Sequence, residues 1–418
     1  MSLGLAEPNG FFMPGALRSL YICYLSLEDP LVQTQVVAYL EGLAARGHTI
    51  HLLTFEPKLT RERKRSLAAE LAGRGITWRS LRYHKRPSLP ATVYDALAGA
   101  LVGIWLVRRH RLDAVHARSH VPAATGLIVR RLTGRRLIFD IRGLLGDEYA
   151  DAGRWRRDGA AYRITAWIQR AAIDRADGIV VLTDRLRGHL FGAERPERTV
   201  VIPCCADLDR LVGDAAGVER LRADLGLEGR SVMVYVGKLT APYMDREMVE
   251  FFAVARRAEP RLAFLVVTQA PAASVVAEFN RSGIAHDDYR VTRSEPGQIG
   301  DYLALADFAI SFCYPTFARI ASSPTKIGEY LGAGLPIVSG PDIGDMDAIL
   351  GGGVGTVVGS FDEGGYEGGA ESIRAIVADS GSRKRCRTVA REVFSLEEVG
   401  IPRYDRLYRE LAAGGGER

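Results

Sequence analysis

The sequence has few cysteines and lacks the compact motifs of several enzyme classes. Its five cysteines are scattered through 418 residues without metal-ligand spacing, and an odd number in a long chain argues against a disulfide framework. This pattern favours a reducing cytoplasm. The chain has no HExxH motif, CxxC motif, Walker P-loop or Ser-His-Asp set, which argues against protease, redox and kinase functions.

Long apolar runs are also missing. The longest nearly unbroken one, residues 96–107, has 12 residues and contains Gly99 and Gly103, so we expect it to be too short to span a bilayer. No cationic N-terminal region is followed by an apolar run and a small-residue cleavage site, so nothing suggests export.

Positive charge is concentrated in the first half. Residues 1–200 hold 31 Lys plus Arg against 19 Asp plus Glu, a surplus of +12, and the totals of 55 and 50 leave 24 against 31, or −7, for the rest. Basic clusters at 61–65, 79–86, 108–111 and 130–136 suit anionic membrane lipid or a phosphorylated acceptor, or are solvated faces. They lack interleaved aromatics and a binding motif, so we expect no nucleic-acid partner.

Length and periodicity predict two α/β domains. A chain of 418 residues exceeds what one core usually supports. Apolar runs alternate with helical patterns, which is typical of parallel, doubly wound sheets. Strands are predicted at 19–25, 49–54, 76–81, 114–116, 137–141, 178–182, 200–202, 231–236, 262–267 and 308–312. Helices are predicted at 32–45, 218–225, about 245–257 and 403–412, and the glycines at 351–353, 364–365 and 368–369 predict loops.

Residues 321–339, ASSPTKIGEYLGAGLPIVS, are the most informative segment. Ser322 or Ser323 suits the N-cap of a helix, and Pro324 suits its first position. Lys326 and Glu329 are three residues apart, hence on one face, near a helix N-terminus that favours an anion. We expect a diphosphate at that end and a ribose bound by Glu329. The alternative is an amphipathic helix between two strands, with both charges solvated.

This segment resembles the signature of retaining glycosyltransferases of family 4, most closely a subgroup with the pattern S-S-P-T-K-x-x-E-Y-L. The subgroup also resembles this chain at 140–143, at Tyr243-Met244 and at 344–347. The resemblance implies the GT-B fold of two facing Rossmann-like domains with a cleft between them. It predicts an acceptor-side domain at 1–207, a linker at 208–229, a donor domain at 230–395 and, in 396–418, a C-terminal helix that crosses back to the first domain.

The resemblance also implies site residues. In the second domain it assigns the donor diphosphate and nucleoside to Gly237, Lys238, Ser322, Ser323, Thr325, Lys326 and Glu329. In the first domain Arg142 would meet donor phosphate or an acidic acceptor, and Glu148 would orient the acceptor hydroxyl. His120 lies in a β-α loop with His116 and Arg118. The candidate catalytic residues are therefore Arg142, Lys238, Glu148 and His120. Structural alternatives are an Asp140–Arg142 pair and loop histidines.

Two departures from the family pattern affect the mechanism. A second lysine usually follows the glycine by six or seven residues, where this chain has Met244 and nearby Arg246, either a substitute cation or an exposed helix residue. The family pattern has a glutamate eight residues before Glu329, where this chain has Ala321. Serine or threonine hydroxyls or backbone N–H groups of 322–325 would then hold the donor sugar.

We therefore expect a cytoplasmic, metal-independent glycosyltransferase. It would move a hexose-type sugar from a nucleoside-diphosphate sugar to an acceptor hydroxyl, with retained anomeric configuration, in polysaccharide, glycolipid or natural-product glycoside synthesis. The acceptor would be a sugar, a lipid-linked molecule or a small molecule, and the basic first half would contact the inner face of the membrane. The alternatives are a GT-B-fold sugar-nucleotide epimerase and a non-catalytic sugar-nucleotide-binding protein. The sequence leaves the base, donor sugar, acceptor and oligomeric state open.

Overall fold

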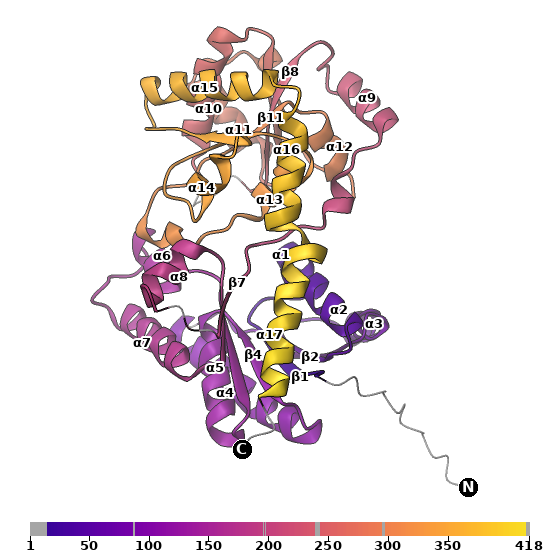
Figure 1. The fold of residues 1–418 in the computed structure, drawn as a ribbon, viewed down its shortest axis with the longest axis vertical. Coiled ribbons are helices and arrows are strands. Elements are labelled where there is room, and N and C mark those ends of the chain that lie inside the picture. The colour runs from indigo at the N-terminus through magenta and orange to yellow at the C-terminus, as the bar shows by residue number, and fades with distance from the viewer. Residues whose placement is uncertain are drawn as a thin grey trace.

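The computed structural model describes residues 15–414, except 87, 195, 197, 239–242 and 295–296, and these residues form two lobes, each built on a parallel sheet (Figure 1). The first sheet has the order β3-β2-β1-β4-β5-β6-β7 and the second β10-β9-β8-β11-β12-β13. The first strands are β1 Arg18–Cys23, β2 Thr49–Glu56, β3 Ile76–Arg82, β4 Ala114–Arg118, β5 Arg136–Ile141, β6 Gly178–Val181 and β7 Thr199–Val201. The second are β8 Ser231–Val236, β9 Leu262–Val267, β10 Tyr289–Thr292, β11 Phe308–Ser311, β12 Ile337–Ser339 and β13 Gly355–Val357.

Helices cover both faces of each sheet because the strands are apolar on both sides. In the first lobe they are α1 Pro30–Val32, α2 Ala38–Ala45, α3 Arg61–Gly73, α4 Ser88–Arg109, α5 His120–Thr133, α6 Leu145–Asp151, α7 Ala160–Arg175 and α8 Asp184–Phe191. The second lobe has α9 Ala215–Asp224, α10 Asp245–Ala258, α11 Ala272–Arg281, α12 Ile299–Ala304, α13 Thr325–Gly332, α14 Met346–Leu350, α15 Glu363–Ala378 and α16 Ser382–Val389. Helix α17, Ile401–Ala413, returns to the first lobe. Short 3₁₀ and π turns include η1 Gln33–Val37, η2 Leu208–Leu211, η4 Phe317–Ala321, η5 Ala390–Phe394 and η6 Leu396–Gly400.

The predicted doubly wound α/β class is confirmed, and every predicted strand is present within a few residues. The predicted helix at 32–45 is interrupted by the π turn η1, where buried Gln35 donates a 2.8 Å hydrogen bond to the carbonyl of Cys205. This bond ties the helix to the segment that leaves the first lobe.

The predicted loop at 364–369 is wrong, since these glycines lie inside α15. Asp362 caps this helix by accepting a 2.9 Å hydrogen bond from the Gly365 N–H. A Cβ at Gly369 would lie 2.9 Å from Val358 and 3.3 Å from Phe251, so the glycine permits close packing on the core. Tertiary contact thus outweighs the low helix propensity of glycine.

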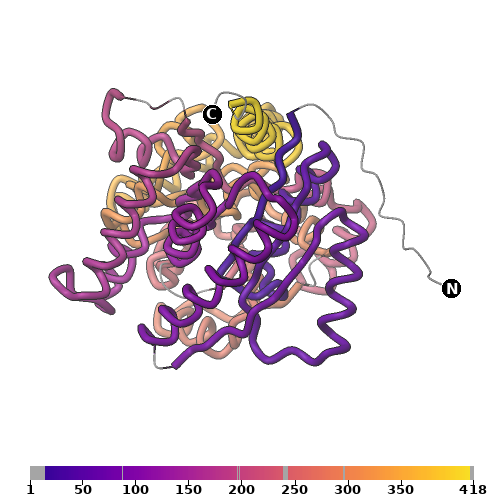
Figure 2. Tube along the Cα trace, turned by 90° about the horizontal axis from the view of Figure 1, so that it is seen from below, coloured from indigo at the N-terminus to yellow at the C-terminus, as the bar shows by residue number. Residues whose placement is uncertain are grey.

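The chain crosses twice between the lobes, at neighbouring points. Ala206 and Ser395 pair as an isolated bridge, and the Ala206 N–H donates to the Phe394 carbonyl at 2.8 Å. Residues 208–229, expected to be a linker, pack on the second core through Leu211 and Leu227. After Ser395 the chain enters the first core, where α17 lies beside α2, and Figure 2 shows this yellow helix against the indigo N-terminal part of the chain.

Candidate active site

Helix α13 begins one residue later than the sequence predicts. It starts at Thr325, with Pro324 rather than Ser322 or Ser323 at the N-cap position, and no side chain caps it. The first-turn N–H groups therefore lack the side-chain acceptor that usually satisfies them. An uncapped helix N-terminus suits an anion such as phosphate.

Lys326 lies in this first turn, buried between two tyrosine rings. Its Nζ donates to the Tyr235 hydroxyl at 2.8 Å and lies 4.0 Å and 3.5 Å from the ring centroids of Tyr235 and Tyr243. Burial lowers the pKa of Lys326 to about 7, although nearby Cys313 and Glu329 favour its charged form. The aromatic faces stabilise the ammonium, and an arriving anion would stabilise it further.

Two other predicted donor residues lie beside Lys326. Gly237 has φ +133°, and a Cβ there would be 3.0 Å from the Lys326 Nζ, so the site needs a glycine at the end of β8. Glu329 is half-buried one turn deeper in α13, where burial raises its pKa and the Lys326 charge partly offsets that rise. The structure therefore brings Gly237, Lys326 and Glu329 together, as the sequence predicts.

The other predicted donor-side residues do not all lie beside Lys326. Lys238 is exposed after β8, and its carbonyl accepts a 3.0 Å hydrogen bond from the Tyr235 hydroxyl. The hydroxyl of Ser323 is turned to the crossover, accepting from the Cys204 N–H at 3.1 Å, and the hydroxyl of Ser322 accepts from Arg319 at 3.1 Å. Thr325 stands at the open end of α13. The two serine side chains thus have protein partners, while the backbone at Thr325 is available to an anion.

Arg319 in η4 is a site residue that the sequence analysis missed. Its Nε is buried without a hydrogen-bond partner among the described residues. Burial raises the pKa of Tyr243 and of Glu148, and the Arg319 charge opposes both rises. Arg319 therefore lies near groups of both domains. The position of Arg319 shortly after β11 could have marked it as a candidate in the sequence, because ligands of parallel sheets bind beyond the carboxyl ends of strands.

Ala321 and Arg246 are explained by their surroundings. Ala321 is fully buried and packs with the core of the first domain, so a glutamate there would lose its hydration. Arg246 is exposed on α10 and pairs with Glu250 at 2.8 Å, the arrangement of a surface helix residue. The geometry thus favours Arg319 over Arg246 as the second cation.

Glu148 is the carboxylate that the sequence predicts on the acceptor side. It is half-buried in α6, and burial raises its pKa, with Asp147 and Asp151 adding to the rise. A Cβ at Gly143 would lie 2.2 Å from the Glu148 Oε1, so the carboxylate closes over this glycine. The carboxylate therefore lies close to the backbone at Gly143, and the Arg319 charge opposes the rise in its pKa.

Arg142 belongs to a buried network as well as to the site. Its Nη1 lies 3.5 Å from Asp140 and its Nη2 donates to the Cys204 sulfur at 3.2 Å. Asp140 also accepts a 3.1 Å hydrogen bond from Tyr404 of α17, and burial opposed by Arg142, His116 and Arg118 leaves its pKa well below the usual range. The Asp140–Arg142 pair that the sequence left as an alternative is therefore present.

The histidines near β4 have structural partners. His120 is buried at the start of α5, its Nε2 lies 2.9 Å from the Gln169 Oε1, and its ring packs on Phe139. Burial lowers the pKa of His120. The Nδ1 of His116 and the hydroxyl of Tyr408 in α17 form a 2.8 Å hydrogen bond. The geometry favours structural roles for both, rather than the catalytic role predicted for His120.

The segment 344–347 joins the two domains, and its Gly344 N–H donates a 2.9 Å hydrogen bond to the Arg319 carbonyl, shortly before the donor helix. Asp345 accepts hydrogen bonds from the N–H groups of Asp184 and Arg185, at 2.7 and 3.0 Å, at the start of α8. The Arg185 side chain adds ion pairs with Asp342 and Asp347, at 3.1 and 3.6 Å. These carboxylates are therefore neutralised by the first domain.

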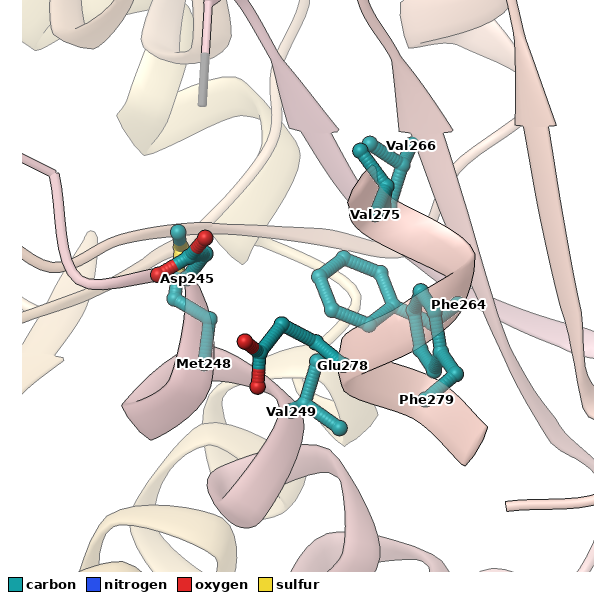
Figure 3. Close-up of a pocket in the computed structure, with 8 residues that line it drawn as sticks. All are labelled: Asp245, Met248, Val249, Phe264, Val266, Val275, Glu278 and Phe279. Carbon is teal, nitrogen blue, oxygen red and sulfur yellow. The ribbon is translucent and has the colours of Figure 1, made fainter. Parts of the chain in front are cut away.

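A small recess in the second domain is separate from these groups. Figure 3 shows Glu278 reaching from α11 toward α10, above an apolar floor. Its lining residues are Asp245, Met248, Val249, Phe264, Val266, Val275, Glu278 and Phe279. None of the donor-site residues named above lines it.

Comparisons with known proteins agree with this architecture. Residues 32–205 match a family model described as a glycosyl transferase 4-like domain. A search of curated proteins found no match. A glycosyltransferase from Rickettsia africae is similar at 13% identity and a TM-score of 0.72, over 95% of this chain and 98% of its own.

Two further solved structures show the same likeness. Sucrose-phosphate synthase from Thermosynechococcus elongatus has 15% identity and a TM-score of 0.70, over 96% of this chain and 100% of its own. HepE from Anabaena, in complex with UDP, has 13% identity and a TM-score of 0.69, over 94% and 99%. The chain therefore has the GT-B fold of two Rossmann-like domains, and its match to a glycosyl transferase 4-like domain at 32–205 supports a transferase enzyme.

Proposed function

We propose that this protein transfers a sugar from a nucleoside-diphosphate sugar to an acceptor hydroxyl. The observation that carries the proposal is Lys326, held between Tyr235 and Tyr243 at the uncapped start of α13, beside Gly237. A preorganised cation and free backbone N–H groups at one point match the charge of a diphosphate leaving group.

In this proposal each domain has its own task. Lys326 and the backbone at Thr325 bind the diphosphate, with Lys238 as a further cation, and Glu329 accepts hydrogen bonds from the ribose. Arg319 takes the place of the missing second lysine, and its Nε, which has no hydrogen-bond partner among the described residues, donates to an oxygen of the departing diphosphate or of the donor sugar. Glu148 orients the acceptor hydroxyl, and its raised pKa suits it to take and return a proton.

The finer features of the proposal come from the family resemblance. They are retention of anomeric configuration, no metal requirement, a cytoplasmic location and a role in polysaccharide, glycolipid or natural-product glycoside synthesis. An NMR spectrum with an inverted anomeric proton in the product would overturn retention. The acceptor is a sugar, a lipid-linked molecule or a small molecule, and the basic first half contacts a membrane.

The first experiment measures thermal stabilisation of the protein by UDP, GDP, ADP and dTDP. A ligand at 100 times its dissociation constant adds about 2.7 kcal/mol of stability, which a melting curve resolves. UDP comes first because HepE, which has a similar fold, was solved with UDP and with UDP-glucose. No stabilisation by any nucleotide would remove the roles of Lys326 and Glu329.

Turnover of the matching nucleotide sugar, with and without acceptor sugars, then separates the proposed function from its alternatives. A transferase consumes the donor faster with an acceptor and yields a glycoside. An epimerase converts the donor without any acceptor, and a non-catalytic binding protein leaves it unchanged.

A further inference from the structure

Helix α4 carries an apolar face that is largely exposed in the described part of the chain. The exposed residues Leu89, Val93, Leu97, Leu101 and Trp105 recur every fourth position, with exposed fractions between 43% and 72%. The distance along the helix from Leu89 to Trp105, sixteen residue steps, is about 24 Å. A contiguous apolar stripe of this kind on one helix marks an interaction surface.

The opposite face of α4 holds the helix on the first domain. A Cβ at Gly99 would lie 2.9 Å from Phe55, and one at Gly103 would lie 3.0 Å from Val129, so the helix packs closely on β2 and α5. With 22 residues, α4 extends beyond the apolar run 96–107 and is the one described helix that is long and apolar enough, by length and composition alone, to cross a bilayer. Because crossing would strip Phe55 and Val129 of this packing, the geometry suits a helix that lies on a membrane.

Cations surround the apolar stripe almost without anions. Residues 79–136 contain twelve Lys or Arg and two carboxylates, Asp95 and Asp113. Asp95 is buried and accepts from the Tyr24 hydroxyl at 2.7 Å, and Asp113 pairs with Arg18 at 2.7 Å. The exposed cations at the ends of α4 are Lys85, Arg86, Arg108, Arg109 and Arg111. Both ends of the stripe are therefore positive.

The neighbouring helices also expose cationic and apolar side chains. Helix α5 packs on α4 and exposes Arg131 and Leu132 in its last turn, and exposed Arg135 follows it. Helix α7, which packs on α5, exposes Trp167. Arg79 stacks on the Trp105 ring at 4.8 Å. Figure 1 shows α4, α5 and α7 in one layer of the first lobe. Tryptophan beside arginine and leucine is typical of the membrane–water interface, where indole rings lie at headgroup level.

We infer that this surface, defined by the exposed residues of α4 with Arg108, Arg109 and Arg131, docks the protein on a bilayer that contains anionic phospholipid. A second copy of the chain fits less well, because a two-fold interface would bring the same cation clusters together. The inference goes beyond sugar transfer, since docking requires no turnover. Helix α4 starts after the carboxyl end of β3, the sheet edge that carries the site, so docking would bring membrane-borne acceptors near that edge.

The test is co-sedimentation of the whole protein with vesicles of phosphatidylcholine alone and of phosphatidylcholine with phosphatidylglycerol in equal parts. We expect binding to the anionic vesicles that weakens with salt. Leu97→Glu with Leu101→Glu should lower the partition coefficient at least tenfold, and so should Arg108→Glu with Arg109→Glu, because each basic residue near an anionic surface strengthens binding several-fold. Both variants should keep the wild-type melting temperature and UDP affinity, since the changed side chains are exposed.

Matched controls lie in the second domain. Val212→Glu changes an exposed apolar residue, and Arg220→Glu with Arg374→Glu changes two exposed arginines. Both should bind vesicles like the wild type. Failure of the wild type to bind anionic vesicles, or equal loss in the controls, would overturn the inference. A wild-type dimer by light scattering that Leu97→Glu with Leu101→Glu converts to a monomer, without vesicle binding, would identify a dimer interface instead.

Discussion

At the residue scale, Lys326 shows how burial prepares a cation for one kind of ligand. The lysine is too buried to be fully charged in the empty site, and its pKa is lowered to about 7. The rings of Tyr235 and Tyr243 compensate part of its lost hydration. The proposed diphosphate would supply the missing counter-charge, so its binding should raise the pKa of Lys326 and favour the charged form.

Lys326→Met should change both stability and its dependence on pH. From pH about 7 to 10.5 the unfolded chain holds the proton that folded Lys326 releases, so the free energy of unfolding of the empty wild type should rise with pH. Binding of the proposed nucleoside diphosphate would take up that proton, so the wild-type affinity for it should fall as pH rises above about 7. Calorimetric titration across this range should show a flatter pH dependence in Lys326→Met. An equal pH dependence of affinity in the variant and the wild type would contradict the assignment of this proton to Lys326. Lys238→Met is the matched lysine control.

Glu329→Ala should weaken nucleotide binding with little loss of fold. Removing a charged hydrogen-bond acceptor costs about 1.5–3 kcal/mol, or roughly 10- to 100-fold in the dissociation constant. Isothermal titration with UDP measures the loss, and melting curves check the fold. Glu371→Ala, at an exposed position of α15, should leave affinity unchanged. Unchanged affinity in Glu329→Ala would remove this residue from the site.

At the element scale, the donor site forms where the turn after β8 meets the start of α13. The turn needs a glycine because Lys326 approaches within contact distance of position 237, and the helix start needs no cap because an anion supplies the acceptor. These two elements are 88 residues apart at Gly237 and Thr325. Only the parallel pairing of β8 with β11 brings them together.

Gly237→Ala should damage both stability and binding. At φ +133° an alanine is strained, and its Cβ would lie 3.0 Å from the Lys326 Nζ. Strain of this kind costs about 1–3 kcal/mol. Thermal denaturation should show the loss, and UDP affinity should fall several-fold because the ammonium is displaced. Gly368→Ala, inside α15 where a Cβ meets nothing, should be neutral or stabilising by up to about 1 kcal/mol. A fully stable Gly237→Ala with normal affinity would contradict this account.

At the scale of the whole molecule, the crossover and several contacts between the domains fix how the domains meet. The chain crosses at Ala206 and Ser395, and α17 is bonded to the first domain through Tyr404 and Tyr408. At a second point Asp345 of the second domain accepts from the first N–H groups of α8. The crossover is covalent, so the contacts that can open when the domains separate are those at Asp345 and at η4, where Ala318 and Ala321 pack with the core of the first domain.

Asp345→Ala should therefore loosen the domain contact. The loss of a helix cap costs about 0.5–2 kcal/mol, and here that energy separates two domains. Small-angle scattering of the empty protein should show a larger radius of gyration than the wild type. Asp362→Ala removes the cap of α15 within one domain, so it should lower the melting temperature with no change in radius. An equal radius in Asp345→Ala and the wild type would refute the role of Asp345 in closure.

The fold and part of the site were predictable from local pattern. Apolar runs located the strands, and the resemblance of 321–339 identified Lys326 and Glu329. The structure differs where contacts outweigh local pattern. Close packing on Phe251 and Val358 keeps glycine-rich α15 helical. His120 stands after a strand, as a site residue would, but Gln169 and Phe139 enclose it.

The sequence by itself determined the class of fold, because strand and helix periodicities are properties of neighbouring residues. It also located helix α13, because the spacing of Lys326 and Glu329 is local, although it expected a serine cap where the structure has Pro324. The tertiary structure decided which charges share one environment. Arg319 reaches the site only because η4 packs on the first domain, and Asp345 becomes a domain contact only because α8 begins beside it. Electrostatic interactions act over distances in space, and the fold sets those distances.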